Sequence, residues 1–165
     1  MNMNIFIIES IILCILFTLI VVPSVRKNPI GAIHDYPPAI AAKAIELGLT
    51  TEKHKRTSKG VIIVKALVAL LIAFLLAFIV KTINHAETFL QGTLTSYSLW
   101  LIVNWYDAFI LDCLWFCHSK KVIIPGTEGM KEYKDYRFHI KAGCVGTIIG
   151  VPVAILVGIF VMLLS

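Results

Sequence analysis

The chain has 165 residues, of which 58% are hydrophobic and 15% are charged, and its net charge is +5. A soluble domain is about a quarter charged, so this composition excludes an ordinary soluble domain. No stripe of basic residues with interleaved aromatic residues is present, so nucleic-acid binding is not expected.

Four runs of apolar residues are long enough to cross a bilayer, because about 20 helical residues span its hydrocarbon core. They are expected at residues 5–22, 61–80, 97–117 and 142–164. Backbone polar groups in lipid must be paired within their own segment, so each run should be helical. The sequence therefore predicts an all-α integral membrane protein, a single domain in which four transmembrane helices form a bundle.

The first run, residues 5–22, resembles a signal peptide only superficially. It lacks a basic segment before its apolar core, and the following VVPSVRK contains no small-residue cleavage site. We expect it to remain as a helix that ends at Pro23.

The segment 23–60 between the first two spans predicts a short helix of its own. The sequence AIAAKAIELGL is rich in helix-forming residues, and Gly48 is placed to end the helix. Ile40, Ala44 and Leu47 share one face at helical spacing. This pattern favours an interfacial helix that lies on the cytoplasmic membrane surface.

Basic residues predict the orientation, because they are enriched in short cytoplasmic loops. Segments 23–60 and 118–141 contain seven and six Lys or Arg residues, whereas Lys81 is the only one between the second and third spans. Both segments are therefore expected in the cytoplasm, with the two termini on the non-cytoplasmic side. The same residues are expected to contact anionic lipid headgroups.

Small residues repeat every four positions along the fourth span and so form one ridge, which allows close helix packing. The ridge consists of Gly146, Gly150, Ala154 and Gly158. A similar row in the second span consists of Ala69, Ala73 and Ala77. Two interpretations remain open: the second and fourth spans pack on each other, or the fourth-span ridge forms a homodimer.

The third span, SLWLIVNWYDAFILDCLWFCHS, carries ionisable residues, which inside a membrane indicate a functional site by default. At about 100° per residue, Asn104, Asp107 and His118 form a polar stripe, and Asp112 flanks it. The structural alternative is that Asp107 accepts hydrogen bonds from a neighbouring helix or pairs with Lys65.

Polar residues of both cytoplasmic segments are expected at the membrane face that Asp112 and His118 reach. These residues are His34, Asp35, Tyr36, Glu128, Tyr136, Arg137 and His139. Each also has an ordinary interpretation as an interfacial anchor or a helix cap. Their convergence follows from the predicted topology alone.

Two classes of function remain open. In the first, a membrane-embedded enzyme acts on a lipid or another amphiphile, with a desolvated carboxylate as general acid or base and a histidine as proton carrier. Its candidate catalytic residues are Asp107, Asp112, His118, Glu128 and His139. Its candidate substrate-binding residues are Asn104, His34, Asp35, Tyr36, Tyr136 and Arg137.

In the second class, the protein binds a small molecule or lipid without catalysis, or is an accessory subunit of a membrane complex.

Several kinds of chemistry lack support in the sequence. No G-x-S-x-G, H-E-x-x-H or Walker motif occurs. A metal site would have to combine Asp112, His118, Glu128 and His139, which form no compact ligand motif. The sequence therefore predicts no metal site and identifies no cofactor.

Overall fold

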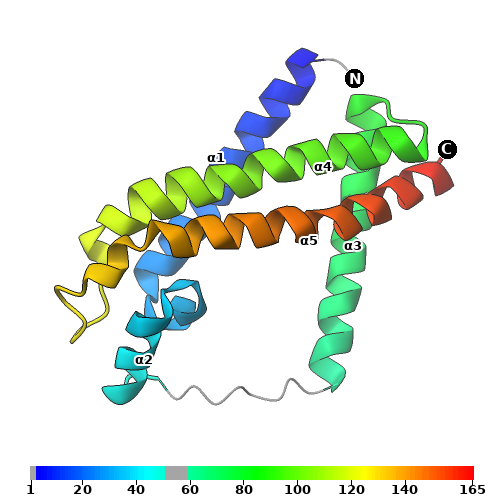
Figure 1. Ribbon diagram of the computed structural model, residues 1–165. Helices are drawn as coiled ribbons and strands as arrows, with labels where there is room; N and C mark the ends of the chain where they lie inside the picture. The colour runs from blue at the N-terminus through cyan, green and yellow to red at the C-terminus, as the bar shows by residue number, and fades with distance from the viewer. Residues whose placement is uncertain (1–2, 51–58) are drawn as a thin grey trace. The chain divides into compact units, whose positions relative to one another are not determined.

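The computed structural model describes residues 3–50 and 59–165, with only the backbone described for residues 59–62 and 64–66. Within these ranges the regular structure is entirely helical (Figure 1). Three of the basic residues counted for orientation, Lys53, Lys55 and Arg56, lie outside the described residues. The side chain of Lys65, a candidate partner of Asp107, lies outside them as well.

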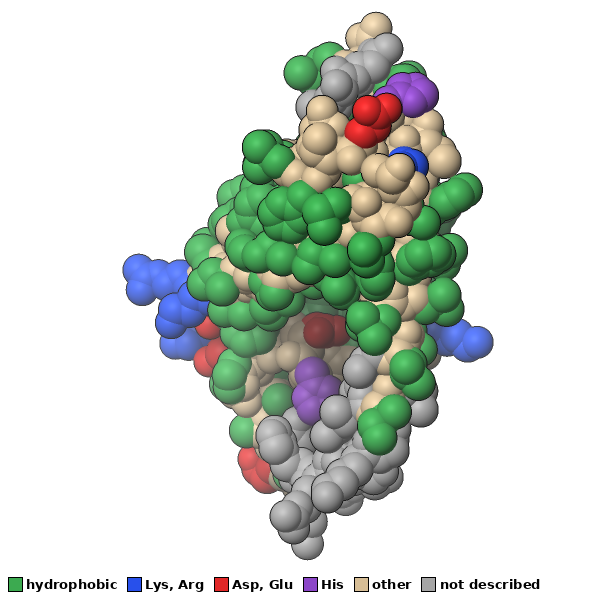
Figure 2. Space-filling view, turned by 90° about the vertical axis from the view of Figure 1, so that its right-hand side faces the viewer, with side chains coloured by type: hydrophobic (Ala, Val, Ile, Leu, Met, Phe, Trp, Pro, Cys, Tyr) green, Lys and Arg blue, Asp and Glu red, His purple; other side chains and the backbone are tan. Residues whose placement is uncertain are grey.

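Four helices in the described part of the chain are long and apolar enough to cross a membrane, as the sequence predicts. They contain α1 (Met3–Lys27), α3 (Lys59–Asn84), α4 (Phe89–Tyr106) and α5 (Tyr136–Leu163). Helix α4 continues into the π-helical segment η2 (Asp107–Trp115) and the 3-10 turn η3 (Phe116–His118). Hydrophobic side chains cover much of the face drawn in Figure 2. These features are compatible with a multi-pass membrane protein.

Helices α1 and α4 extend beyond the predicted spans. Helix α1 does not end at Pro23 but continues to Lys27, since a proline removes one backbone donor without always stopping a helix in an apolar segment. Helix α4 begins at Phe89 because Thr88 and Gln91 form a capping box. The Gln91 backbone N–H donates to Thr88 Oγ1 over 3.2 Å, and the Thr88 N–H donates to Gln91 Oε1 over 3.3 Å.

The predicted short helix between the first two spans is present as α2 (Pro38–Glu46). Gly48 follows it with a φ of 70°, a left-handed conformation that favours glycine. The sequence predicts that its apolar face lies on the membrane, but Ile40 and Ala44 are buried in a hydrophobic core. That part of the prediction is wrong: the face packs against protein, and only Leu47 at its edge is exposed.

The contacts divide the chain into two compact units. The first unit consists of Met1–Leu13, His54–Asn104 and Val145–Ser165, and the second consists of Cys14–Lys53 and Trp105–Cys144. Helices α1, α4 and α5 each contribute residues to both, so the division does not follow consecutive segments. The single membrane domain over residues 1–165 stays a prediction.

The core of the first unit joins α3 to α5. Ala73 and Ala77 of α3 pack with Val157 and Val161 of α5, and all four are nearly inaccessible to solvent. The second and fourth predicted spans therefore pack on each other, as one of the two interpretations expects.

The glycine ridge of α5 packs against α4 within the same unit. A Cβ added at Gly150 would meet the indole of Trp100, and one added at Gly158 would meet the hydroxyl of Thr93. Trp100 Nε1 donates a hydrogen bond to the Gly146 carbonyl over 2.9 Å. The ridge thus has a partner within the chain, and the predicted homodimer stays a prediction.

The core of the second unit is built around two tyrosines. Tyr36 is 2% exposed, and its hydroxyl donates to the Val122 carbonyl over 2.8 Å. Burial raises the pKa of Tyr36, so this hydroxyl stays protonated. The Tyr133 hydroxyl accepts from the Ile124 backbone N–H over 2.9 Å and lies 2.6 Å from Thr127 Oγ1. The Tyr36 bond joins the segment before α2 to the segment after η3, and the Tyr133 bonds hold residues 124–133 together.

Candidate functional site

A cavity of about 280 Å³ lies in the second unit, among α1, η1 (Ile30–Asp35), η2 and α5. It is lined by five ionisable side chains, those of His34, Asp35, Asp107, Asp112 and His139, and otherwise by apolar groups. This volume can hold several waters or a small polar group. In Figure 2, a histidine and an acidic side chain are visible in a hollow of an otherwise mainly hydrophobic face.

Asp112 and His139 form a close polar contact at this cavity. His139 Nδ1 lies 3.1 Å from Asp112 Oδ2, with the histidine buried and the aspartate partly exposed. The rings of Phe116 and Phe138 contact the imidazole edge-on, each with a centroid separation of 5.2 Å. The carboxylate and the two rings therefore fix the orientation of His139.

The second ring nitrogen of His139 is buried and has no hydrogen-bond partner among the described residues. A neutral imidazole has one N–H donor and one acceptor nitrogen. A carboxylate only accepts, so Nδ1 of His139 carries the proton that it donates to Asp112. Nε2 is then an acceptor, and a ligand with an O–H or N–H group would satisfy it.

The π-helical backbone of η2 brings Asp107 and Asp112 to the same cavity. In an α-helix, two residues five positions apart lie about 140° apart around the axis. In a π-helix the hydrogen bonds run from i to i+5, so such residues lie nearly above one another. Asp112 therefore does not flank a stripe, as the α-helical spacing predicts, but lines the same cavity as Asp107.

Asp35 ends η1, and its carboxyl completes the acidic group. Partial desolvation and then the charge of Asp112 raise the pKa of Asp35, whereas His34 and His139 lower it. Asp107 interacts electrostatically with both of the other aspartates. Three carboxylates and two imidazoles share one small space with apolar walls, and so the cavity favours positive charge.

Six of the eleven predicted site residues lie away from this cavity. Asn104 belongs to the first unit, where its amide lies 3.4 Å from Thr147 Oγ1. Tyr36 lies in the core of the second unit. Neither Asn104 nor Tyr36 lines the cavity.

The remaining four lie at the surface of the second unit. His118 and Tyr136 are exposed and contact each other, with 3.3 Å between Nε2 and the hydroxyl oxygen. Glu128 lies in an exposed turn and accepts from the Gly126 N–H over 2.8 Å. Arg137 is exposed at the start of α5. None of the four contributes to the cavity lining.

The sequence analysis overlooked a second polar pair, in the first unit. Asn84 Nδ2 donates to Glu9 Oε2 over 2.6 Å, joining the end of α3 to α1. The other oxygens, Glu9 Oε1 and Asn84 Oδ1, are buried without partners among the described residues. The sequence does contain a signal for this pair, because Glu9 is a carboxylate within the first apolar run.

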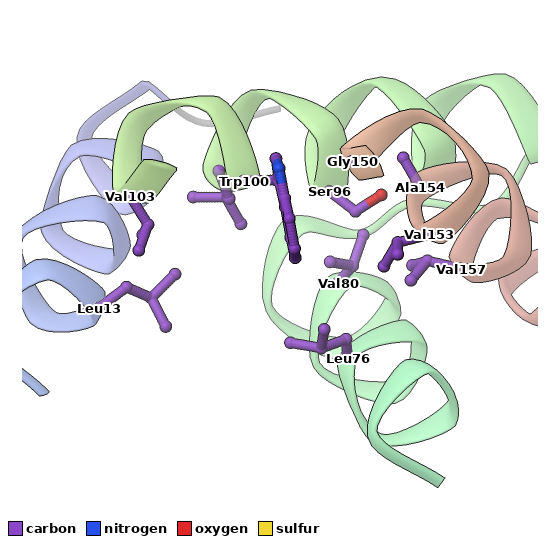
Figure 3. Close-up of a pocket in the computed structure, with 11 residues that line it drawn as sticks. Leu13, Leu76, Val80, Ser96, Trp100, Val103, Gly150, Val153, Ala154 and Val157 are labelled. Carbon is purple, nitrogen blue, oxygen red and sulfur yellow. The ribbon is translucent and has the colours of Figure 1, made fainter. Parts of the chain in front are cut away.

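A second cavity, of about 170 Å³, lies in the first unit and is almost wholly apolar. Trp100 lies beside it, with Leu76 and Val80 of α3 opposite (Figure 3). Among its lining residues, Ser96 and Trp100 alone carry polar side-chain atoms, and none is ionisable. Acid–base chemistry is therefore supported at the cavity of the second unit and not here.

The described residues include no group of three or more His, Cys, Asp or Glu side chains arranged to hold a metal ion. All four cysteines are free. Comparison of the chain with protein-family models, with curated proteins and with solved structures found no match. The case for a function therefore rests on the cavity.

Proposed function

We propose that the protein is a multi-pass membrane enzyme that performs acid–base chemistry on an amphiphilic substrate at the cytoplasmic end of its helices. The observation that carries this proposal is the buried His139, bound to Asp112 at one nitrogen and without a partner at the other. A histidine held in this way is poised to accept a proton from a bound group.

His139 is the catalytic residue in this proposal, and Asp112 is its positioning residue. The carboxylate keeps the proton on Nδ1 and stabilises the imidazolium that forms when Nε2 accepts a proton. Asp107 and Asp35 line the same space and would hold the substrate by accepting its hydrogen bonds. Phe116 and Phe138 limit rotation of the imidazole.

Two features support an amphiphile that arrives from the membrane. Most of the cavity wall is apolar, including Phe17 and Val21 of α1. Close to the end of α1, the exposed residues Arg26, Lys27 and Lys121 line a shallow surface groove. Such a basic group attracts the anionic lipids that surround a protein at a cytoplasmic membrane surface, and it lies outside the cavity that would select the substrate.

A non-enzymatic binding protein or accessory subunit is the second candidate, and one observation favours it. The cavity lining, as far as the chain is described, includes no hydroxyl, thiol or amine. A covalent intermediate on this chain would therefore have to form on a carboxylate or an imidazole, and proton transfer is the simpler chemistry for this lining.

Mass spectrometry of lipids can separate the two candidates. Purified wild-type protein and the His139→Gln variant would each be incubated with a total membrane lipid extract. An enzyme should bind an amphiphile and convert it only in the wild type. Retained binding without conversion in both proteins would favour the second candidate, and the absence of any bound amphiphile would contradict both.

A further inference from the structure

The polar groups of the cavity in the second unit share one hydrogen-bonding character. When ionised, Asp35, Asp107 and Asp112 can only accept hydrogen bonds, and Nε2 of a neutral His139 also only accepts. His34 has a further interaction within the protein. A ligand that satisfies this cavity must therefore bring donors.

The same groups favour a positive charge. Asp112 is bound to His139, whereas Asp107 and Asp35 add two more carboxylates to the same lining. A phosphate or carboxylate head group would be repelled by the carboxylates of the cavity. A neutral alcohol would not compensate their negative charge. Charges with apolar walls around them interact more strongly than in bulk water.

Aromatic rings line part of the same cavity. Trp115, Phe116 and Phe138 all contribute to it. A cation over the face of an aromatic ring is attracted by the ring's quadrupole, most strongly for tryptophan. The walls and the carboxylates thus favour the same kind of head group.

We infer that this cavity binds the protonated primary amine of an amphiphile, with the ammonium held by Asp107 and Asp35 and facing Nε2 of His139. An ammonium group has three N–H donors and a positive charge, and so matches both properties. This inference rests on the proposed function and identifies its substrate class. His139 would accept one ammonium proton, which leaves a neutral amine and an imidazolium beside Asp112.

The test compares four ligands with the same twelve-carbon chain: dodecylamine, dodecyltrimethylammonium, dodecanol and dodecyl phosphate. Wild-type protein in phosphatidylcholine nanodiscs would be titrated with each at neutral pH, with empty nanodiscs correcting for partition into lipid. We expect dodecylamine to bind about tenfold more tightly than each of the other three, a difference of about 1.4 kcal/mol. Equal binding of the quaternary ammonium, or tighter binding of the alcohol or phosphate, would overturn the inference.

Matched variants test the location of the amine. Asp107→Asn should weaken dodecylamine binding about tenfold, whereas Glu128→Gln, which removes an exposed carboxylate outside the cavity, should leave it unchanged. An equal loss in both variants would show that surface charge accounts for binding. Since the ligand comparison uses wild-type protein, it stands even where a variant fails to fold.

The inference and the proposed function can fail separately. Conversion of a lipid that contains no amine by the wild type, but not by the His139→Gln variant, would overturn the inference and leave the function standing. Selective binding of dodecylamine without conversion of any lipid would support the inference and contradict the enzymatic function.

Discussion

Asp107 and Asp112 line the same cavity although they are five residues apart, because the helix between them is π-helical. π-helical turns occur frequently at functional sites. Here the widened turn places two carboxylates side by side, an arrangement that an α-helix would not produce at this spacing. The electrostatic repulsion between them must be offset by a cation, a proton or a neighbouring donor.

Two substitutions of Asp112 should separate its structural role from its role in positioning His139. Asp112→Ala leaves both nitrogens of the buried His139 without a partner, which should cost about 1–3 kcal/mol of stability. Asp112→Asn keeps an oxygen that can accept from Nδ1, so stability should change little, while any lipid conversion should fall steeply. Thermal denaturation in detergent measures the first effect, and the lipid assay measures the second. Equal stability losses in both variants would contradict this role for the oxygen.

The hydroxyl of Tyr133 should be important for the fold of the second unit. Thr127 donates to the Ile124 carbonyl over 2.7 Å, so the Tyr133 hydroxyl donates to Thr127 while it accepts from the Ile124 N–H. Tyr133→Phe leaves a buried N–H unpaired and should cost about 1–3 kcal/mol in thermal or denaturant unfolding.

Tyr136→Phe is the matched control for this substitution. Tyr136 is exposed, and the expected change in unfolding free energy is within about 0.5 kcal/mol. Similar effects of the two substitutions would show that the buried bonds of Tyr133 do not stabilise the fold.

The raised pKa of Asp35 predicts a pH dependence of stability. The folded carboxyl binds its proton at higher pH than the unfolded chain does, so the folded state holds more protons between the two pKa values. Stability should therefore fall as pH rises through that window. Asp35→Asn should remove this pH dependence. At pH values above the window, its melting temperature should be slightly higher than that of the wild type. Since Asp112 raises this pKa while His34 and His139 lower it, melting curves of Asp112→Asn should show a smaller slope as well.

Composition and local signals were sufficient to predict the helices. The four apolar runs predict four long helices, and Gly48 predicts the end of α2. The start of α4 at Phe89 was not predicted, although Thr88 and Gln91 have the spacing of a capping box. In each case the decisive interaction lies within a few residues along the chain.

The cavity could be predicted only in part. Carboxylates in the third span mark the right helix, but nothing in the residues between Asp107 and Asp112 indicates a π-helical backbone. The α-helical wheel therefore grouped Asp107 with Asn104 and His118, neither of which lines the cavity. Contacts far apart in sequence, such as Asp112 with His139, depend on how the helices pack.

The packing of the glycine ridge on α4 predicts a position-specific loss. A Cβ at Gly150 would meet the Trp100 ring, and overpacking of this kind usually costs about 1–3 kcal/mol. Gly150→Ala should therefore lower the melting temperature in detergent. Ile148→Ala, at a position with 71% exposure on the same helix, should change it little. If Gly150→Ala instead changed only the oligomeric state, measured by light scattering, the ridge would be an interface between copies.

An isosteric and an apolar substitution of Glu9, the partner of Asn84, should change stability in opposite directions. Glu9→Gln keeps an oxygen that accepts from Asn84 Nδ2 and adds N–H donors near the unpartnered Asn84 Oδ1. An amide also carries no charge into the apolar segment. Unfolding in detergent should therefore show a gain of about 1 kcal/mol, the net value of one hydrogen bond. Glu9→Leu leaves the buried Asn84 amide unpaired and should cost about 1–3 kcal/mol. A loss of stability in the glutamine variant would mean that the charge of Glu9 itself is needed, and hence that a cation or donor outside the described contacts satisfies it.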